Sequence, residues 1–321
     1  MNKKIIAIAI AAAMTAPVAM ADVKLSGRMA AHLTSLDTDG TADNVTGYGD
    51  QGHARIQLDA KAGDTFARMA WDARAGKNLG QREQYLGVKF GKGMSLAFNR
   101  MAGAAKNIEK DPYIATFLQT RKTIAESVTS NKYGSSSFVD HLAQFKMKAG
   151  AAKITVQYDL GDNSASSSNE GHTAIAVTGK GGPVSYWASY NNGTADGNNK
   201  SLTTSQSNIK VGAAMKFGAA KVSLNYTSMD KDGLTTSAGN STDSVLLMAN
   251  MGFGKGLSGN VAVATRSGDV GADDATYTRL AIAKKLHKNA TVYAGYTATD
   301  YDAASTSADT SEIGVGMTIK F

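Results

Sequence analysis

Arginines that recur on one face of alternating segments are the residues of this chain best placed to do chemistry. Arg28 and Arg55 fall on the polar positions of segments in which apolar and polar residues alternate. Arg68 and Arg74 follow by the same rule on the next segment. A guanidinium keeps its charge at any physiological pH and offers several donors, so a row of them attracts and steers anions without a covalent step.

Nucleophilic and metal chemistry has no comparable signal in the sequence. The chain has no cysteine, and its five histidines stand apart from one another. Neither a G-x-S-x-G nucleophile elbow nor an H-E-x-x-H zinc motif occurs. We therefore expect no enzymatic activity, no cofactor and no metal site.

The N-terminus has the pattern of an export signal. A basic start is followed by an apolar run that is too short to span a bilayer and then by Ala19-Met20-Ala21, which resembles a cleavage site. We expect residues 1–21 to be a removed signal peptide and residues 22–321 to form a single domain. An exported protein without cysteine must gain its stability from something other than disulfides.

The net charge is modestly positive, and the basic residues are spread along the sequence. The chain is +7, and removal of Lys3 and Lys4 leaves 32 basic against 27 acidic residues, hence +5. No Lys/Arg block or basic-aromatic interleaving occurs, so we expect no nucleic-acid partner. A balance of this size biases a water-filled path only weakly toward anions.

The elements that must position the arginines have a period of two residues. In "KITVQYDL", for example, Ile154, Val156 and Tyr158 alternate with Thr155 and Gln157. Such runs are strands with one apolar and one wet face. Short connections such as "GKG" alternate with long ones rich in Asp, Asn, Ser, Thr and Gly, which is typical of a meander of antiparallel hairpins.

Counting the runs gives about 16 strands, with apolar residues outward and polar residues inward, which is typical of an outer-membrane β-barrel. We expect an all-β fold, a transmembrane antiparallel barrel. A secreted sandwich or solenoid also alternates, and it remains the alternative fold. The regular turn asymmetry and the Ala- and Gly-rich apolar positions favour the barrel, whose closed sheet pairs every backbone group in hydrocarbon.

One segment, residues 101–140, breaks the rhythm between two strands. Loops of this length in a compact fold are usually functional. A wet external loop seldom needs apolar side chains such as Ile114, Phe117, Leu118 and Ile124. We expect this segment to be a third external loop that folds inward against the barrel wall.

At this point the chain resembles the general trimeric porins of Gram-negative bacteria. "DVKLSGRMAAHL" looks like the first strand of that family, and "GHARIQLDAKAGDTFARMAWDAR" is similar to the second and third. "QREQYLGVKFGKGMSLAFNRM" resembles the fourth and fifth strands, and the terminal Phe321 matches the family's C-terminal aromatic. The layout agrees along residues 22–321, but the specific motifs lie mainly between Asp22 and Met101 and at the end.

The resemblance implies a homotrimer of 16-stranded barrels in the outer membrane, in contact with lipid and lipopolysaccharide. It implies a constriction loop at residues 101–140 opposite a ladder of basic wall residues. It also implies that Phe321 is part of the signal read by the barrel-assembly machinery.

Carried over position by position, the basic ladder corresponds to Arg28, Arg55 and Arg82. Arg82 shares parity with Leu86 and Val88, so we expect it at the mouth of its strand. The family has a further arginine whose position falls near His141 in this chain, so the chain departs from the family there. The family's acidic loop tip is absent, and its place is taken by charged residues of both signs, namely Glu109, Asp111, Glu126, Arg121 and Lys122.

The function that follows is passive diffusion of small hydrophilic solutes and ions through a charged constriction, with a weak preference for anions. A solute-selective channel of the same fold is one alternative. A barrel with structural or adhesive roles and an outer-membrane enzyme are alternatives of another class.

Overall fold

A computed structural model describes residues 22–40, 45–48, 54–73, 79–108, 111–113, 116–119, 138–160, 172–193, 206–231, 241–268, 274–302 and 308–321. Residues 1–21, which we expect to form the signal peptide, lie outside these described residues. The described helical turn is α2 (Ala104–Asn107), and no helix in these ranges is long and apolar enough to cross a membrane.

The strands follow one another along the chain as β1 (Asp22–Thr38), β2 (Val45–Tyr48), β3 (Ala54–Ala62), β4 (Thr65–Ala73), β5 (Gly80–Phe90), β6 (Met94–Ala102), β7 (Phe138–Ala149), β8 (Ala152–Asp159), β9 (His172–Gly181), β10 (Val184–Gly193), β11 (Gln206–Phe217), β12 (Ala220–Lys231), β13 (Ser241–Gly254), β14 (Leu257–Gly268), β15 (Ala275–His287), β16 (Ala290–Tyr301) and β17 (Thr310–Lys320).

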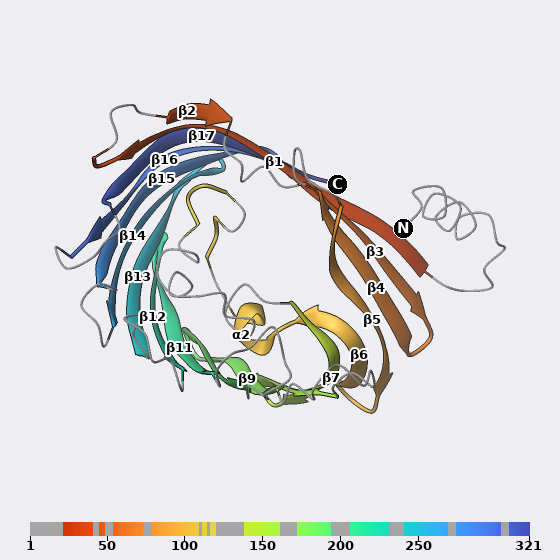
Figure 1. The fold of residues 1–321 in the computed structure, drawn as a ribbon. Helices are drawn as coiled ribbons and strands as arrows, with labels where there is room; N and C mark the ends of the chain where they lie inside the picture. The colour runs from red at the N-terminus through yellow and green to blue at the C-terminus, as the bar shows by residue number, and fades with distance from the viewer. Residues whose placement is uncertain are drawn as a thin grey trace.

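These strands form one closed antiparallel sheet. Each pairs with its neighbour in sequence, and β17 pairs with β1. β3 pairs with residues 22–29 of β1 and β2 with residues 33–36, so β2 and β3 share one position beside β1. The result is the expected barrel of 16 strands, seen end-on as a ring in Figure 1.

Side-chain alternation sorts the two faces of the sheet. The outward positions carry large apolar side chains, and Leu86 (64% exposed) and Ile313 (61%) are typical. The inward positions carry small or polar residues, including the buried Ala97, Gln157 and Ser223. The sheet is therefore apolar toward lipid and polar toward its lumen, as the alternating sequence predicts.

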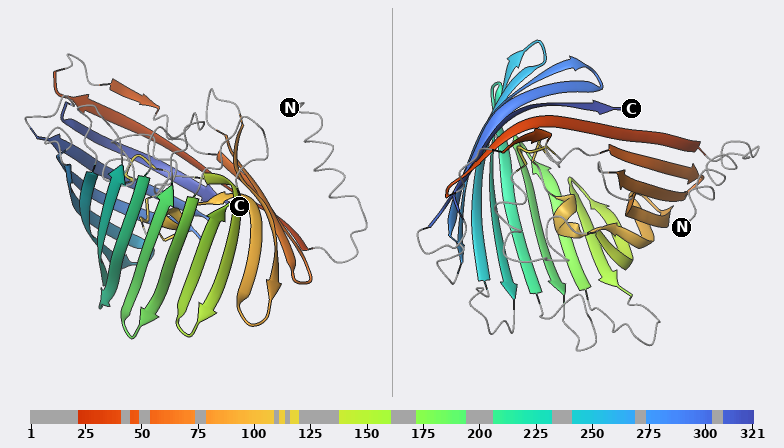
Figure 2. Two further views of the ribbon diagram at one scale, coloured as in Figure 1. Left: turned by 60° about the horizontal axis from the view of Figure 1, so that its bottom comes forward. Right: turned by 45° about the horizontal axis from the view of Figure 1, so that its top comes forward.

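The two ends of the barrel differ in the length of their connections. Gly63 and Asp64 join β3 to β4, and Gly63 has a φ of +57°, a left-handed value that glycine adopts without strain. Similar tight turns join β5 to β6 and β7 to β8 at the lower end of the left view of Figure 2. In outer-membrane barrels the short turns face the periplasm. The end with the tight turns is thus the periplasmic end.

The seam between the first and last strands is closed by Phe321. Its backbone N–H donates to the Gly27 carbonyl over 3.1 Å, and its carbonyl accepts from the Gly27 N–H over 2.9 Å. Its ring covers Gly27, since a Cβ at that position would lie 2.2 Å from Cζ of Phe321. An aromatic ring laid over a glycine protects backbone that has no side chain of its own.

Replacing Phe321 with alanine should weaken this seam. Because the ring is about half exposed, we expect a loss of ~1–2 kcal/mol, measured as a lower temperature at which the folded band disappears in semi-native electrophoresis. Ile319→Ala is the control, since Ile319 faces outward on the same strand. An equal loss in both variants would show that the contact with Gly27 is unimportant.

Candidate functional site

The lumen carries a group of arginines on adjacent strands, which we call the arginine wall: Arg28 of β1, Arg55 of β3, Arg68 of β4 and Arg82 of β5. Arg28 and Arg55 are register partners across the β1–β3 pair, so their side chains leave the same face of the sheet. They alternate with the exposed Met29 and Ile56 of the outer face. That the two arginines line a constriction stays a prediction.

Asp72 of β4 joins two members of the arginine wall. Its Oδ1 accepts a hydrogen bond from Nε of Arg55 over 3.1 Å, and its Oδ2 accepts one from Nη1 of Arg82. The side chains of all three residues are mostly buried. One carboxylate thus holds two guanidiniums side by side and cancels part of their charge.

Arg82 reaches the lumen because β5 contains a bulge. Ala70 pairs with Glu83 and Trp71 with Gln81, so Arg82 is the extra residue between them. A bulge changes the face on which the following side chains emerge. Parity with Leu86 would have pointed Arg82 outward, whereas the bulge turns it inward to Asp72.

Arg68 is also held by carboxylates, and it lies nearer the periplasmic end than Arg55 and Arg82. Its Nε donates to Asp59 over 2.7 Å, and Nη1 lies 3.7 Å from a carboxylate oxygen of Glu83. Its guanidinium also lies over the Tyr85 ring, 5.8 Å from the centroid. The arginine wall is therefore fixed mainly by carboxylates of its own and neighbouring strands.

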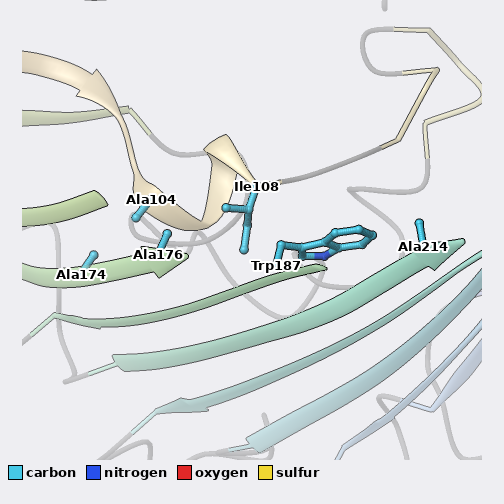
Figure 3. Packing of buried hydrophobic residues seen from close by; sticks show 6 residues of the cluster. All are labelled: Ala104, Ile108, Ala174, Ala176, Trp187 and Ala214. Atoms are coloured by element: carbon cyan, nitrogen blue, oxygen red, sulfur yellow. The ribbon is translucent and has the colours of Figure 1, made fainter. Parts of the chain in front are cut away.

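The described pieces of the long segment lie inside the ring (Figure 1). Ala104 and Ile108, at the two ends of α2, are buried against Ala174, Trp187 and Ala214 of β9, β10 and β11. Figure 3 shows Ile108 beside the Trp187 ring above these strands. Small inward residues on the strands leave the space that this packing requires.

Farther along the segment, three apolar residues pack on the other side of the barrel. Tyr113, Phe117 and Leu118 form a buried cluster with Tyr293 of β16. Glycines make room for it. A Cβ on Gly295 would lie 2.7 Å from Cδ2 of Leu118, and one on Gly314 would lie 3.0 Å from Cζ of Phe117. Of the apolar residues that the sequence flagged in this segment, Phe117 and Leu118 thus contact the inner wall, whereas Ile114 and Ile124 lie outside the described residues.

A charged residue fixes the same piece of chain, in what we call the Arg279 anchor: Arg279 of β15 with Asp111, Leu118 and Asn260. Arg279 is 0% exposed. It donates to Oδ1 of Asp111 over 2.9 Å, to the Leu118 carbonyl over 2.5 Å and to Oδ1 of Asn260 over 2.7 Å. Charge-assisted bonds to buried groups are the strong kind.

The Arg279 anchor also shapes the segment internally. The guanidinium lies over the Tyr113 ring, 5.0 Å from the centroid. Oδ1 of Asp111 accepts a hydrogen bond from the Tyr113 N–H over 3.0 Å, and the Thr116 hydroxyl donates to the Tyr113 carbonyl over 2.7 Å. Burial raises the pKa of Tyr113, so its phenol stays neutral at physiological pH.

His32 is a further lumen residue that this segment covers. It lies on β1 and is 2% exposed, and its ring centroid is 5.6 Å from that of Phe117. By contrast, His141, near which the resemblance places a family arginine, is exposed and has a left-handed φ of +55°. Arg100 lies close by and forms an ion pair with Asp140 over 2.6 Å.

The predicted site residues thus fall into three groups. The arginine wall comes together as a cluster, although its partners Asp59, Asp72 and Glu83 were not foreseen. Asp111 lies in the Arg279 anchor on β15 and not beside the arginine wall. The rest lie outside the described residues: Arg74, Glu109, Arg121, Lys122 and Glu126.

Comparison with known families decides what this barrel is. The model of the family described as Gram-negative porin matches residues 7–304. The chain belongs to the Gram-negative porin family. This porin is an outer-membrane channel for the passive diffusion of small hydrophilic solutes and ions. A search of curated proteins found no match.

Solved structures agree on the fold of this porin. OmpF of Salmonella typhi, in a complex with daunomycin, superposes with a TM-score of 0.74 at 17% identity, over 93% of this chain and 97% of the other. The anion-selective porin of Comamonas acidovorans gives 0.69 at 16% identity, over 94% and 100%. OmpT of Vibrio cholerae, in a trimer form, gives 0.68 at 16%, over 94% and 100%.

Proposed function

We propose that this porin prefers anions weakly, and that its arginine wall faces a constriction formed by residues 101–140. The observation that carries the proposal is the charge of the wall, in which four arginines meet three carboxylates, Asp59, Asp72 and Glu83. The small excess of positive charge accords with a weak preference. The Comamonas porin, a protein of the same fold, is described as anion-selective.

The contacts of the lumen segment support the place of the constriction. Its described residues pack on β9–β11 and on β15–β17. Arg82 and Lys106 both lie over the Phe138 ring, at 4.3 and 4.7 Å from its centroid, where the segment meets the arginine wall. Solutes would then pass between the segment and strands β3–β5.

Transport in this proposal involves no covalent step and no cofactor. Within the described residues, no group of three or more His, Asp or Glu side chains is arranged to hold a metal ion. By family membership we propose a homotrimer, supported by the trimer form of Vibrio cholerae OmpT. Removal of residues 1–21, recognition of Phe321 by the barrel-assembly machinery and contact with lipid and lipopolysaccharide belong to the same proposal.

Reversal potentials in planar bilayers test the charge preference. Arg28→Glu combined with Arg55→Glu should make the channel cation-selective, because it replaces two positive charges of the wall with negative ones. The double variant changes the charge of the wall by four units. One unit charge acting through water at ~6 Å already corresponds to about a threefold change, so the chloride-to-potassium permeability ratio should fall at least about threefold.

The control carries the same change of charge outside the lumen. Lys92→Glu with Lys288→Glu alters two exposed residues of periplasmic turns. We expect its permeability ratio to stay close to that of the unmodified porin. If the two double variants shift the ratio equally, the arginine wall does not set selectivity.

A further inference from the structure

Lysines line the periplasmic half of the lumen along β7–β12, and we call them the lysine arc: Lys148 of β7, Lys153 of β8, Lys180 of β9, Lys216 of β11 and Lys221 of β12. Their inward direction follows from alternation. Lys153 shares its face with the buried Gln157, and Lys221 shares its face with the buried Ser223.

The register sets these charges next to one another. Lys148 is the cross-strand partner of Lys153, and Lys216 is the partner of Lys221. Like charges directly opposite each other destabilise a sheet. Two such pairs within six consecutive strands therefore carry a cost that a bound anion would remove.

No carboxylate on these strands offsets that cost. Residues 141–158, 172–193 and 206–229 contain neither Asp nor Glu. The acidic residues of the same strands, Asp140, Asp159 and Asp230, lie at the opposite, extracellular ends. The arginine wall is different, because each of Arg55, Arg68 and Arg82 has a carboxylate partner.

A cavity of about 570 Å³ lies within the lysine arc. Lys153, Lys180 and Lys221 line it together with the hydroxyl-bearing Thr178 and Ser185. The floor is rigid, because Trp187 is 2% exposed and its Nε1 donates to Oδ1 of Asn225 over 3.0 Å. Ammonium and hydroxyl groups together are the donors that phosphate oxygens accept from.

We propose that the lysine arc binds a linear anion of the polyphosphate type. Adjacent strands are about 4.8 Å apart, so Lys153 and Lys221, four strands apart, are separated by roughly 19 Å along the wall. A single phosphate reaches one neighbouring pair of lysines at most. A chain of phosphates is longer than a single phosphate and, because the long lysine side chains extend toward it, contacts several ammonium groups at once. The inference extends the anion preference proposed above but rests on other residues.

Tripolyphosphate is the probe, added to both sides of a bilayer that holds the full-length channel in 0.1 M KCl. We expect it to reduce single-channel current, and orthophosphate at matched ionic strength to reduce it far less. The variant K153Q/K180Q/K221Q should raise the half-blocking concentration about tenfold or more, since three charged contacts are removed.

The matched control is K61Q/K89Q/K92Q, which removes the same charge from the periplasmic ends of β3 and β5 and the turn after β5. Its half-blocking concentration should stay within about twofold of the unmodified channel's. Absence of block, equal block by orthophosphate, or equal weakening in both triple variants would overturn the proposal. The reversal potential in KCl alone, measured on R28E/R55E, reports separately on the arginine wall.

Discussion

Replacing Arg279 with methionine should release residues 111–113 and 116–119 from the barrel wall and turn a steady channel into one that fluctuates. The substitution leaves the Asp111 carboxylate buried without its ion-pair partner, because both side chains of the pair are almost fully buried. Breaking such a pair costs about 3–5 kcal/mol. The cost is avoided if the segment leaves the wall, so its detached population should rise by about two to four orders of magnitude.

Single-channel recording measures this directly. We expect more frequent transitions between conductance levels in R279M, with unchanged β-sheet circular dichroism because the strand pairing of β15 does not depend on this side chain. The double variant D111N/R279M is the control, since it also removes the negative charge of Asp111. It should fluctuate less than R279M. With the single variant D111N and the unmodified channel, these proteins form a double-mutant cycle. Equal behaviour of R279M and the unmodified channel would show that the Arg279 anchor does not hold the segment.

The barrel itself could be predicted because one rule acts on every strand. Ile313, Val315, Met317 and Ile319 alternate with small or polar residues, and the structure places all four outward on β17. That alternation is a local property, dictated by the opposite directions of successive side chains in a strand. The closing pair β1–β17 follows once lipid is the solvent, since an unpaired edge is not tolerated there.

Arg82 shows where alternation stops being enough. The bulge opposite Ala70 and Trp71 adds one residue to β5. A prediction of inward or outward direction that counts residues across the bulge is therefore reversed. The bulged position in "GQREQY" is occupied by arginine and not by glycine or proline, so the local sequence does not indicate a bulge there. The bulge is stabilised instead by Asp72 on the neighbouring strand, a contact that local sequence patterns do not encode.

The Arg279 anchor is the second feature that the sequence did not predict. Alternation with Leu280 and Ile282 does place Arg279 on the inner face of β15. Its partner Asp111 is 168 positions away, however, and was expected to face the arginine wall. Several inward arginines compete for the acids of residues 101–140, and only the path of the segment decides which one pairs with Asp111.

Replacing Asp72 with asparagine should increase the preference for anions more than the same neutralisation of Asp59 or Glu83, the other carboxylates that pair with the arginine wall. Asp72 is the shared acceptor of Arg55 and Arg82, so its loss removes one negative charge and exposes two positive ones to the lumen. One unit charge acting through water at ~6 Å is worth about 0.7 kcal/mol, which corresponds to roughly a threefold rise in the chloride-to-potassium permeability ratio.

Salt dependence and a matched variant separate this effect from a general change in net charge. The rise should be large in 0.1 M KCl and small in 1 M KCl, because the screening length falls from about 10 Å to about 3 Å. Asp64→Asn makes the same change of charge in an exposed turn, where the hydrogen bond from Lys89 uses the Asp64 backbone carbonyl and survives the substitution. A permeability ratio that moves equally in D64N and D72N would mean that the paired carboxylate does not mask the arginines.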